Sequence, residues 1–169
     1  MKTKKLVVIA FFAALTCVAT FVIKIPSPTG GYYNLGDCIV LISAYMLGPY
    51  YGAISSGIGS MFADLISGAP QYAGATLIIK GLVALAAGFM FNHLKLKTPM
   101  RQITAGIIGE IIMVLGYFGF TVLMLDSQVE PALVSMLGDT GQALVGIATS
   151  TILYEVLRRN KSIKDIMNF

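Results

Sequence analysis

The chain has few charged residues. Asp, Glu, Lys and Arg make up 12% of its 169 residues and hydrophobic residues make up 56%, whereas soluble globular domains carry about 25% charge. Such a composition excludes a water-soluble domain, and it excludes a disordered chain, which needs high charge and low hydrophobicity. The sequence therefore predicts an all-α integral membrane protein that forms a single membrane domain over residues 1–169.

Sequence motifs of catalysis are missing as well. The two cysteines lie in or beside apolar runs, which excludes a disulfide framework, and the single histidine, His93, has no neighbouring metal ligands. The chain contains no phosphate loop of the Gly-x-x-x-x-Gly-Lys-Ser/Thr type, no His-Glu-x-x-His and no Gly-x-Ser-x-Gly. We therefore expect no enzyme activity and no cofactor. We also expect no nucleic-acid binding, because no basic patch is interleaved with aromatic residues.

Six apolar stretches predict six transmembrane helices. The second and third are short and are separated by residues 48–52, where one proline and two glycines favour a tight turn. A membrane span needs about 20 residues, so six spans with short connections use the whole chain. The predicted spans are 6–23, 35–47, 53–67, 76–91, 103–125 and 132–157.

The basic residues predict the orientation of the bundle. Ten of the twelve lie before the first span, between the fourth and fifth spans, or after the sixth span: Lys2, Lys4, Lys5, Lys95, Lys97, Arg101, Arg158, Arg159, Lys161 and Lys164. Lys and Arg in short loops stay on the cytoplasmic side, and an even number of spans separates the three clusters. We therefore predict a multi-pass protein of the cell membrane with cytoplasmic N- and C-termini. A cleaved signal peptide is the alternative interpretation of the first span.

Ionisable residues within or at the edges of the spans predict a pocket. They are Asp37, Asp64, Lys80, Glu110 and Asp139. Each would cost about 2.5 to 3.5 kcal/mol at the bilayer centre, so they are expected to face the bundle interior. The predicted topology places Glu110 near the midplane and the other four in the outer half, which is typical of a pocket open to the outside. An internal ion pair between Asp64 and Lys80 is the alternative.

The expected pocket is formed by spans four to six beneath the first two outer loops. These loops are rich in proline, glycine and tyrosine, and polar groups over an apolar cleft are typical of small-molecule sites. Tyr32 and Tyr33 could instead anchor the protein at the membrane interface. The candidate binding residues are Lys80, Asp139, Gln142, Tyr117, Asn34, Asp37, Tyr33, Gln71 and Glu110.

Four segments carry a resemblance to a known family. They are Asn34-Leu-Gly-Asp37, Leu47-Gly-Pro-Tyr-Tyr-Gly-Ala53, Gly57-Ile-Gly-Ser-Met-Phe-Ala-Asp64 and Ala75-Thr-Leu-Ile-Ile-Lys-Gly81. In this order they resemble the signatures of the substrate-binding S components of energy-coupling factor (ECF) vitamin transporters. The resemblance implies a six-helix protein that captures a vitamin from outside. It also implies partners: a transmembrane T component and two ATPase subunits.

Further expectations follow from this resemblance. Ala10-Phe-Phe-Ala-Ala14 matches the family's Ala-x-x-x-Ala surface for the T component, although such spacing also serves ordinary helix packing. The motifs look most like the branch for hydroxymethylpyrimidine, pyridoxine and riboflavin. The lack of tryptophan and the several acidic groups favour pyridoxine or hydroxymethylpyrimidine over riboflavin. A stand-alone ion-coupled carrier that uses Asp64 and Glu110 as proton sites is a further alternative.

Overall fold

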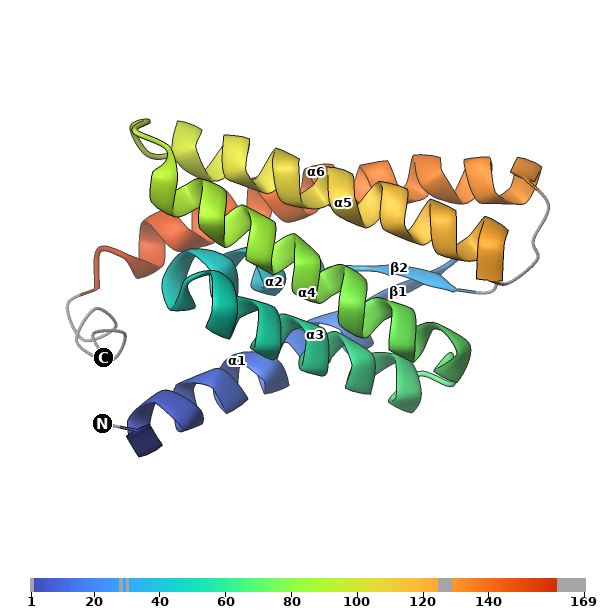
Figure 1. Cartoon of the computed structure of the whole chain (residues 1–169), viewed down its shortest axis with the longest axis horizontal. Helices are drawn as coiled ribbons and strands as arrows, with labels where there is room; N and C mark the ends of the chain where they lie inside the picture. Colours follow the sequence, from blue (N-terminus) through green and yellow to red (C-terminus); the bar gives the residue numbers. More distant parts are fainter. Residues whose placement is uncertain (1, 28, 30, 125–128, 161–169) are drawn as a thin grey trace.

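Six helices and one short β-hairpin form the bundle in Figure 1, a computed structural model that describes residues 2–27, 29, 31–124 and 129–160. Lys161 and Lys164 of the third basic cluster lie outside the described residues. The elements are α1 (Lys2–Val22), β1 (Lys24–Pro26), β2 (Tyr32–Asn34), α2 (Gly36–Leu47), α3 (Pro49–Ile66), α4 (Pro70–His93), α5 (Met100–Met124) and α6 (Val129–Leu157). The predicted all-α membrane fold with six helices is confirmed.

Five of the six helices begin earlier than the apolar pattern predicts, and proline accounts for two of these starts. The chain turns at Gly48, whose φ of 80° glycine adopts without strain, and α3 already begins at Pro49. α4 likewise begins at Pro70. Proline suits the first helical turn because the N–H that it lacks would have no partner there. The predicted turn over residues 48–52 is therefore too long, and Gln71 belongs to a helix and not to an outer loop.

Apolar length distinguishes the helices from one another. Among the residues described, α1, α4 and α5 each contain a stretch long and apolar enough to cross a membrane, and α2 is a shorter apolar helix. Ionisable residues and stripes of small or hydroxylated residues occur in α3 and α6, which lowers their hydropathy. Both helices supply walls of the pocket described below.

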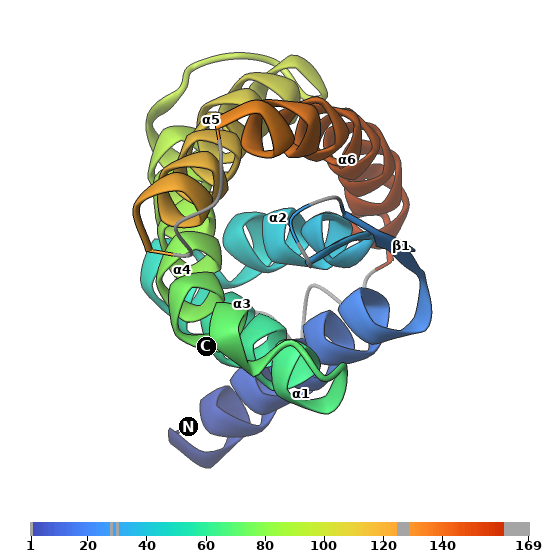
Figure 2. The same ribbon diagram turned by 90° about the vertical axis from the view of Figure 1, so that its right-hand side faces the viewer.

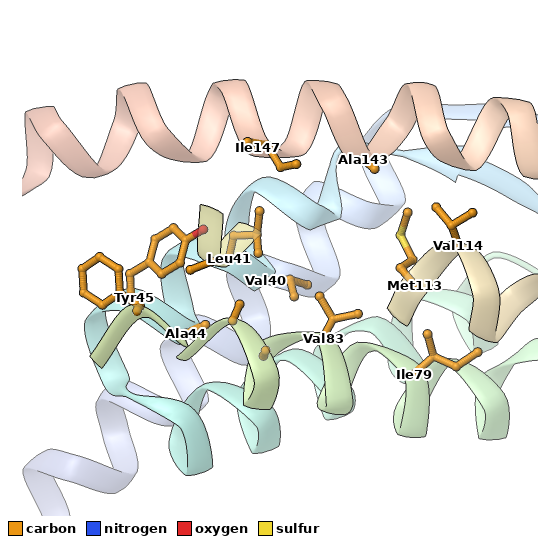
Figure 3. Packing of buried hydrophobic residues seen from close by; sticks show 14 residues of the cluster. Val40, Leu41, Ala44, Tyr45, Ile79, Val83, Met113, Val114, Ala143 and Ile147 are labelled. Carbon is orange, nitrogen blue, oxygen red and sulfur yellow. The ribbon is translucent and has the colours of Figure 1, made fainter. Parts of the chain in front are cut away.

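The short helix α2 occupies the centre of the bundle. Viewed along the bundle in Figure 2, it is surrounded by α1, α3, α4, α5 and α6. Val40, Leu41 and Ala44 are completely buried in the main core. There they pack with Val83 of α4 and Ile147 of α6, among others (Figure 3).

The basic clusters gather at one end of the bundle. The start of α1, the end of α4, the start of α5 and the end of α6 all lie at the left in Figure 1. The hairpin lies toward the opposite end, where β1 and β2 pair antiparallel and Ile25 is opposite Tyr33. This arrangement agrees with the even number of spans that the charge pattern requires.

Candidate functional site

A polar pocket lies under the hairpin. It contains about 600 Å³ of space free of atoms, the open mouth included. All lining residues except Gly31, Phe118 and Ala132 carry a polar side-chain group. The polar lining residues are Thr20 of α1; Ser27, Thr29, Tyr32 and Asn34 of the hairpin segment; Ser60 and Asp64 of α3; Tyr72, Thr76 and Lys80 of α4; Tyr117 and Thr121 of α5; and Ser135, Asp139 and Gln142 of α6.

An ion pair between Lys80 and Asp37 lies at one wall of the pocket. Both side chains are at most 2% exposed. The Lys80 ammonium nitrogen also lies 2.9 Å from the Met113 sulfur and 5.5 Å from the centre of the Tyr117 ring. Because Asp37 offsets the charge of Lys80, the ammonium can be buried here without a net local charge from the pair.

Gln142 joins this ion pair to the hairpin. Its amide nitrogen donates to Oδ2 of Asp37 over 2.5 Å, and its amide oxygen accepts the backbone N–H of Asn34 over 2.6 Å. Both ends of one side chain are therefore used, and the position of β2 is tied to the buried carboxylate of Asp37.

The hairpin segment makes further contacts across the pocket. The Ser27 hydroxyl lies 2.7 Å from that of Ser135 on α6, and the Tyr72 hydroxyl of α4 donates to the Thr29 carbonyl over 2.8 Å. The segment is thus held by helices on both sides of the pocket.

Asp64 supplies a carboxylate to the pocket wall formed by α3. The Tyr32 hydroxyl donates to its Oδ1 over 2.6 Å, whereas its Oδ2 is buried and has no hydrogen-bond partner among the residues described. Burial, followed by the hydrogen bond to Asp64, raises the pKa of the Tyr32 phenol, so the phenol stays a proton donor. Two neighbouring hydroxyls, of Thr20 and Ser60, are also buried without a partner in the described part of the chain.

Unpartnered polar atoms of this kind are costly. A buried donor or acceptor without a partner costs about 1 to 3 kcal/mol. Those of Thr20, Ser60 and Asp64 all line the same pocket. The pocket wall can therefore accept hydrogen bonds from a polar molecule through Asp64 and donate hydrogen bonds to it through the hydroxyls of Thr20 and Ser60.

Five of the residues suggested by the sequence line this pocket together: Lys80, Asp139, Gln142, Tyr117 and Asn34. Tyr117 lines the pocket from α5, and its hydroxyl donates to that of Thr76 over 3.0 Å. Asp139 stands on α6 near Lys80, which it influences electrostatically. Residues from four separate segments thus meet at one place.

Four other candidates lie outside the lining of this pocket. Asp37 is behind Lys80 as its ion-pair partner, and Tyr33 donates to the Ser135 carbonyl over 3.3 Å. Gln71 is exposed in the first turn of α4, because the helix begins at Pro70. Glu110 lies between α5 and α6 and lines a different, apolar groove.

Sequence reasoning left out the walls that α1 and α3 supply. Asp64 was recognised as an interior carboxylate, but the suggested ion pair with Lys80 is wrong because Lys80 pairs with Asp37. The signal for the α3 wall was the helical spacing of Gly57, Ser60 and Asp64 on one face. Thr20 carried no such signal.

Comparison with known proteins identifies the family. The family described as "ECF-type riboflavin transporter, S component" matches residues 1–159. The chain belongs to this family. It is therefore a transporter component of the membrane, in a family that does not consist of catalytic enzymes.

Several curated proteins are similar to this chain in sequence. A Pyrococcus woesei protein named "Uncharacterized protein in gap 3'region" is 33% identical over 84% of this chain and 93% of its own length. The "Thiamine precursor transporter HmpT" of Lactococcus lactis subsp. cremoris is 27% identical over 92% and 89%. The "Probable biotin transporter BioY" of Lysinibacillus sphaericus is 34% identical over 66% and 61%.

A solved structure has the same fold. The crystal structure of the S component for biotin from an ECF-type ABC transporter superposes with a TM-score of 0.74 and 21% identity. The match covers 99% of this chain and 97% of that one. At this identity the likeness supports the bundle and not the choice of ligand.

Proposed function

We propose that this S component captures a small heteroaromatic vitamin or precursor, of the pyridoxine or hydroxymethylpyrimidine type, from outside the cell. The observation that carries the proposal is the buried Oδ2 of Asp64, which has no hydrogen-bond partner among the described residues, in a pocket with mostly polar walls. A carboxylate accepts hydrogen bonds from a hydroxyl, an amine or a protonated ring nitrogen, and ligands of this class offer such groups. Tyr72 and Tyr117 offer aromatic faces for the ring.

Charge favours a neutral or cationic ligand. Lys80 is already paired with Asp37, whereas Asp64 and Asp139 add two more carboxylates to the wall. A ligand with its own carboxylate, such as biotin, would meet like charges in a poorly solvated place. The same carboxylates would attract a protonated ring.

Polarity favours a small ligand over riboflavin, the alternative within the family. A flavin needs a large apolar slot for its ring system, and here Phe118 and Ala132 are the lining residues with apolar side chains. The thiamine precursor named for the Lactococcus relative is in keeping with a smaller molecule. A riboflavin site would therefore need a wide rearrangement of the polar wall.

The energy for uptake is proposed to come from partners. We infer that a T component and two ATPase subunits complete the transporter in the cytoplasmic membrane. Ala10 and Ala14 are both exposed on the same face of α1, where a partner helix could approach closely. A stand-alone carrier coupled to ions is the competing proposal.

Binding measurements test the ligand class. Calorimetry on the purified protein in nanodiscs would compare pyridoxine, hydroxymethylpyrimidine, riboflavin and biotin, and mass spectrometry would identify any molecule retained through purification. We expect one of the first two to bind, and we expect Asp64→Asn to weaken its binding at least tenfold. Glu130→Gln, which changes an exposed carboxylate at the start of α6, is the matched control.

Two outcomes would contradict the proposal. Tight binding of riboflavin or biotin alone would refute the ligand class. Uptake into vesicles without any ATPase, abolished by an uncoupler, would instead support the stand-alone carrier.

A further inference from the structure

A second concave site lies between α5 and α6, away from the vitamin pocket. Figure 1 shows the two helices side by side along the bundle. The groove between them has about 630 Å³ of space free of atoms, its open side included, and it shares no lining residue with the polar pocket. Apart from Glu110 and Thr140, its lining is apolar, with Ile111 and Leu115 of α5 facing Ala143 and Leu144 of α6.

The open side of this groove faces the surroundings of the bundle. Ile111, Leu115 and Leu144 are between 51% and 65% exposed. In a membrane, these side chains contact lipid tails. A molecule dissolved in the hydrocarbon phase could therefore enter the groove without passing through the polar pocket.

Glu110 is the ionisable residue among those that line the groove. It is 2% exposed, and neither carboxylate oxygen has a hydrogen-bond partner within the described residues. It lies ten residues after Met100, about 15 Å along the helix axis, which is near the middle of a membrane span. Thr140 cannot serve as its donor, since its hydroxyl donates to the Met136 carbonyl over 2.8 Å.

Several ionisable groups from other helices lie around Glu110. Asp37 of α2 and Lys80 of α4 act on it electrostatically, and these two already form an ion pair with each other. Asp139 of α6 acts on the same lysine, and Tyr45 of α2 is a further titratable group near Glu110. Among these described groups only Lys80 and Asp37 form a salt bridge, so the Glu110 carboxyl has no direct counter-ion.

We propose that the groove between α5 and α6 binds a lipophilic organic cation, with Glu110 as its counter-ion. The apolar walls bury the body of such a molecule, and the carboxylate offsets its charge. An ion pair in a medium of low dielectric constant is much stronger than in water, and a lipophilic cation has little hydration to lose on entering. Binding at this site does not depend on the identity of the vitamin.

Binding of radiolabelled methyltriphenylphosphonium to the protein in nanodiscs of zwitterionic lipid tests this site. We expect saturable binding to the wild type and at least tenfold weaker binding to Glu110→Gln, which keeps the size of the side chain and removes its charge. Glu110→Asp should retain binding because the carboxylate stays. Glu130→Gln, at the exposed start of α6, is the control for nonspecific charge effects.

A groove variant covers the case in which Glu110→Gln fails to fold. Leu144→Trp fills the groove from an exposed wall position and leaves Glu110 in place, and we expect it to abolish saturable binding. Triphenylphosphine oxide, a neutral molecule of similar shape, should not compete. The absence of saturable binding to the wild type, equal binding to Glu110→Gln, or full competition by the neutral molecule would each overturn the proposal. Vitamin binding is measured on the same samples, so failure of this site is separable from failure of the vitamin pocket.

Discussion

The substitution Asp37→Asn removes the counter-ion of Lys80. Lys80 is 2% and Asp37 1% exposed at the side chain, so neither group can turn to water. The Met113 sulfur near the ammonium is a weak acceptor and cannot replace a carboxylate. An asparagine has one side-chain oxygen where the aspartate has two, so either the Lys80 ammonium or the Gln142 amide nitrogen loses its acceptor.

The expected cost follows from these contacts. Removing one partner of a buried ion pair leaves the other charge without its hydrogen-bonded counter-ion and costs about 3 to 5 kcal/mol. The free energy of unfolding of Asp37→Asn should fall by this amount, measured by titration with sodium dodecyl sulfate in mixed micelles. A second variant, Lys80→Met, is measured in the same way. It removes the charge of Lys80 and keeps an unbranched side chain.

The double variant decides between an ion pair and simple packing. If the charge of Lys80 is what destabilises Asp37→Asn, then Asp37→Asn with Lys80→Met should be more stable than Asp37→Asn alone. The two substitutions would then show a coupling energy of at least about 1 kcal/mol in a double-mutant cycle. Purely additive losses would refute the ion-pair reasoning.

Three further predictions concern packing, the hairpin and the ligand. A Cβ atom at Gly59 would lie 2.3 Å from the Ala13 carbonyl oxygen. Gly59→Ala should therefore separate α1 from α3 and lower the free energy of unfolding by about 1 to 3 kcal/mol. Gly119→Ala is the control and should leave the free energy of unfolding unchanged, because a Cβ atom there has no other atom within 4 Å. Equal stabilities of these two variants would contradict the close approach. Gln142→Leu removes the acceptor of the Asn34 backbone N–H in β2. The Asn34 amide hydrogen should then exchange at least tenfold faster in hydrogen-exchange mass spectrometry. Unchanged protection would show that the hairpin is held by other contacts. Asp139→Asn should weaken vitamin binding by about 1 to 3 kcal/mol in calorimetry, and wild-type affinity would remove this residue from the site.

The sequence predicted the helices better than their ends. Apolar length identifies a span because the bilayer requires it, and the six stretches all became helices. The starts at Pro49 and Pro70 were missed because proline and glycine were taken to end a helix, whereas proline also fits the first turn. The hairpin strands are three residues each, too short for any alternating pattern to mark them.

The sequence predicted an interior site lined by ionisable residues, but it did not predict which of these residues pair with one another. The cost of charge in a membrane placed the ionisable residues in the interior, and Lys80 and Asp139 do line one pocket. The sequence could not predict that Lys80 pairs with Asp37 and not with Asp64, because several carboxylates lie at a similar predicted depth. The choice depends on how the helices are arranged, with α2 inside the ring formed by the other five (Figure 2).

The shortness of the central helix has a consequence for ligand size. With 12 residues, α2 is about 18 Å long, whereas the hydrocarbon layer is about 30 Å thick. The helix is thus about 12 Å shorter than the layer, and only Leu35 separates its first residue from the hairpin strand β2. Because the pocket wall includes the hairpin residues that precede α2, we expect that adding one helical turn at Gly36 would narrow the range of molecules that bind.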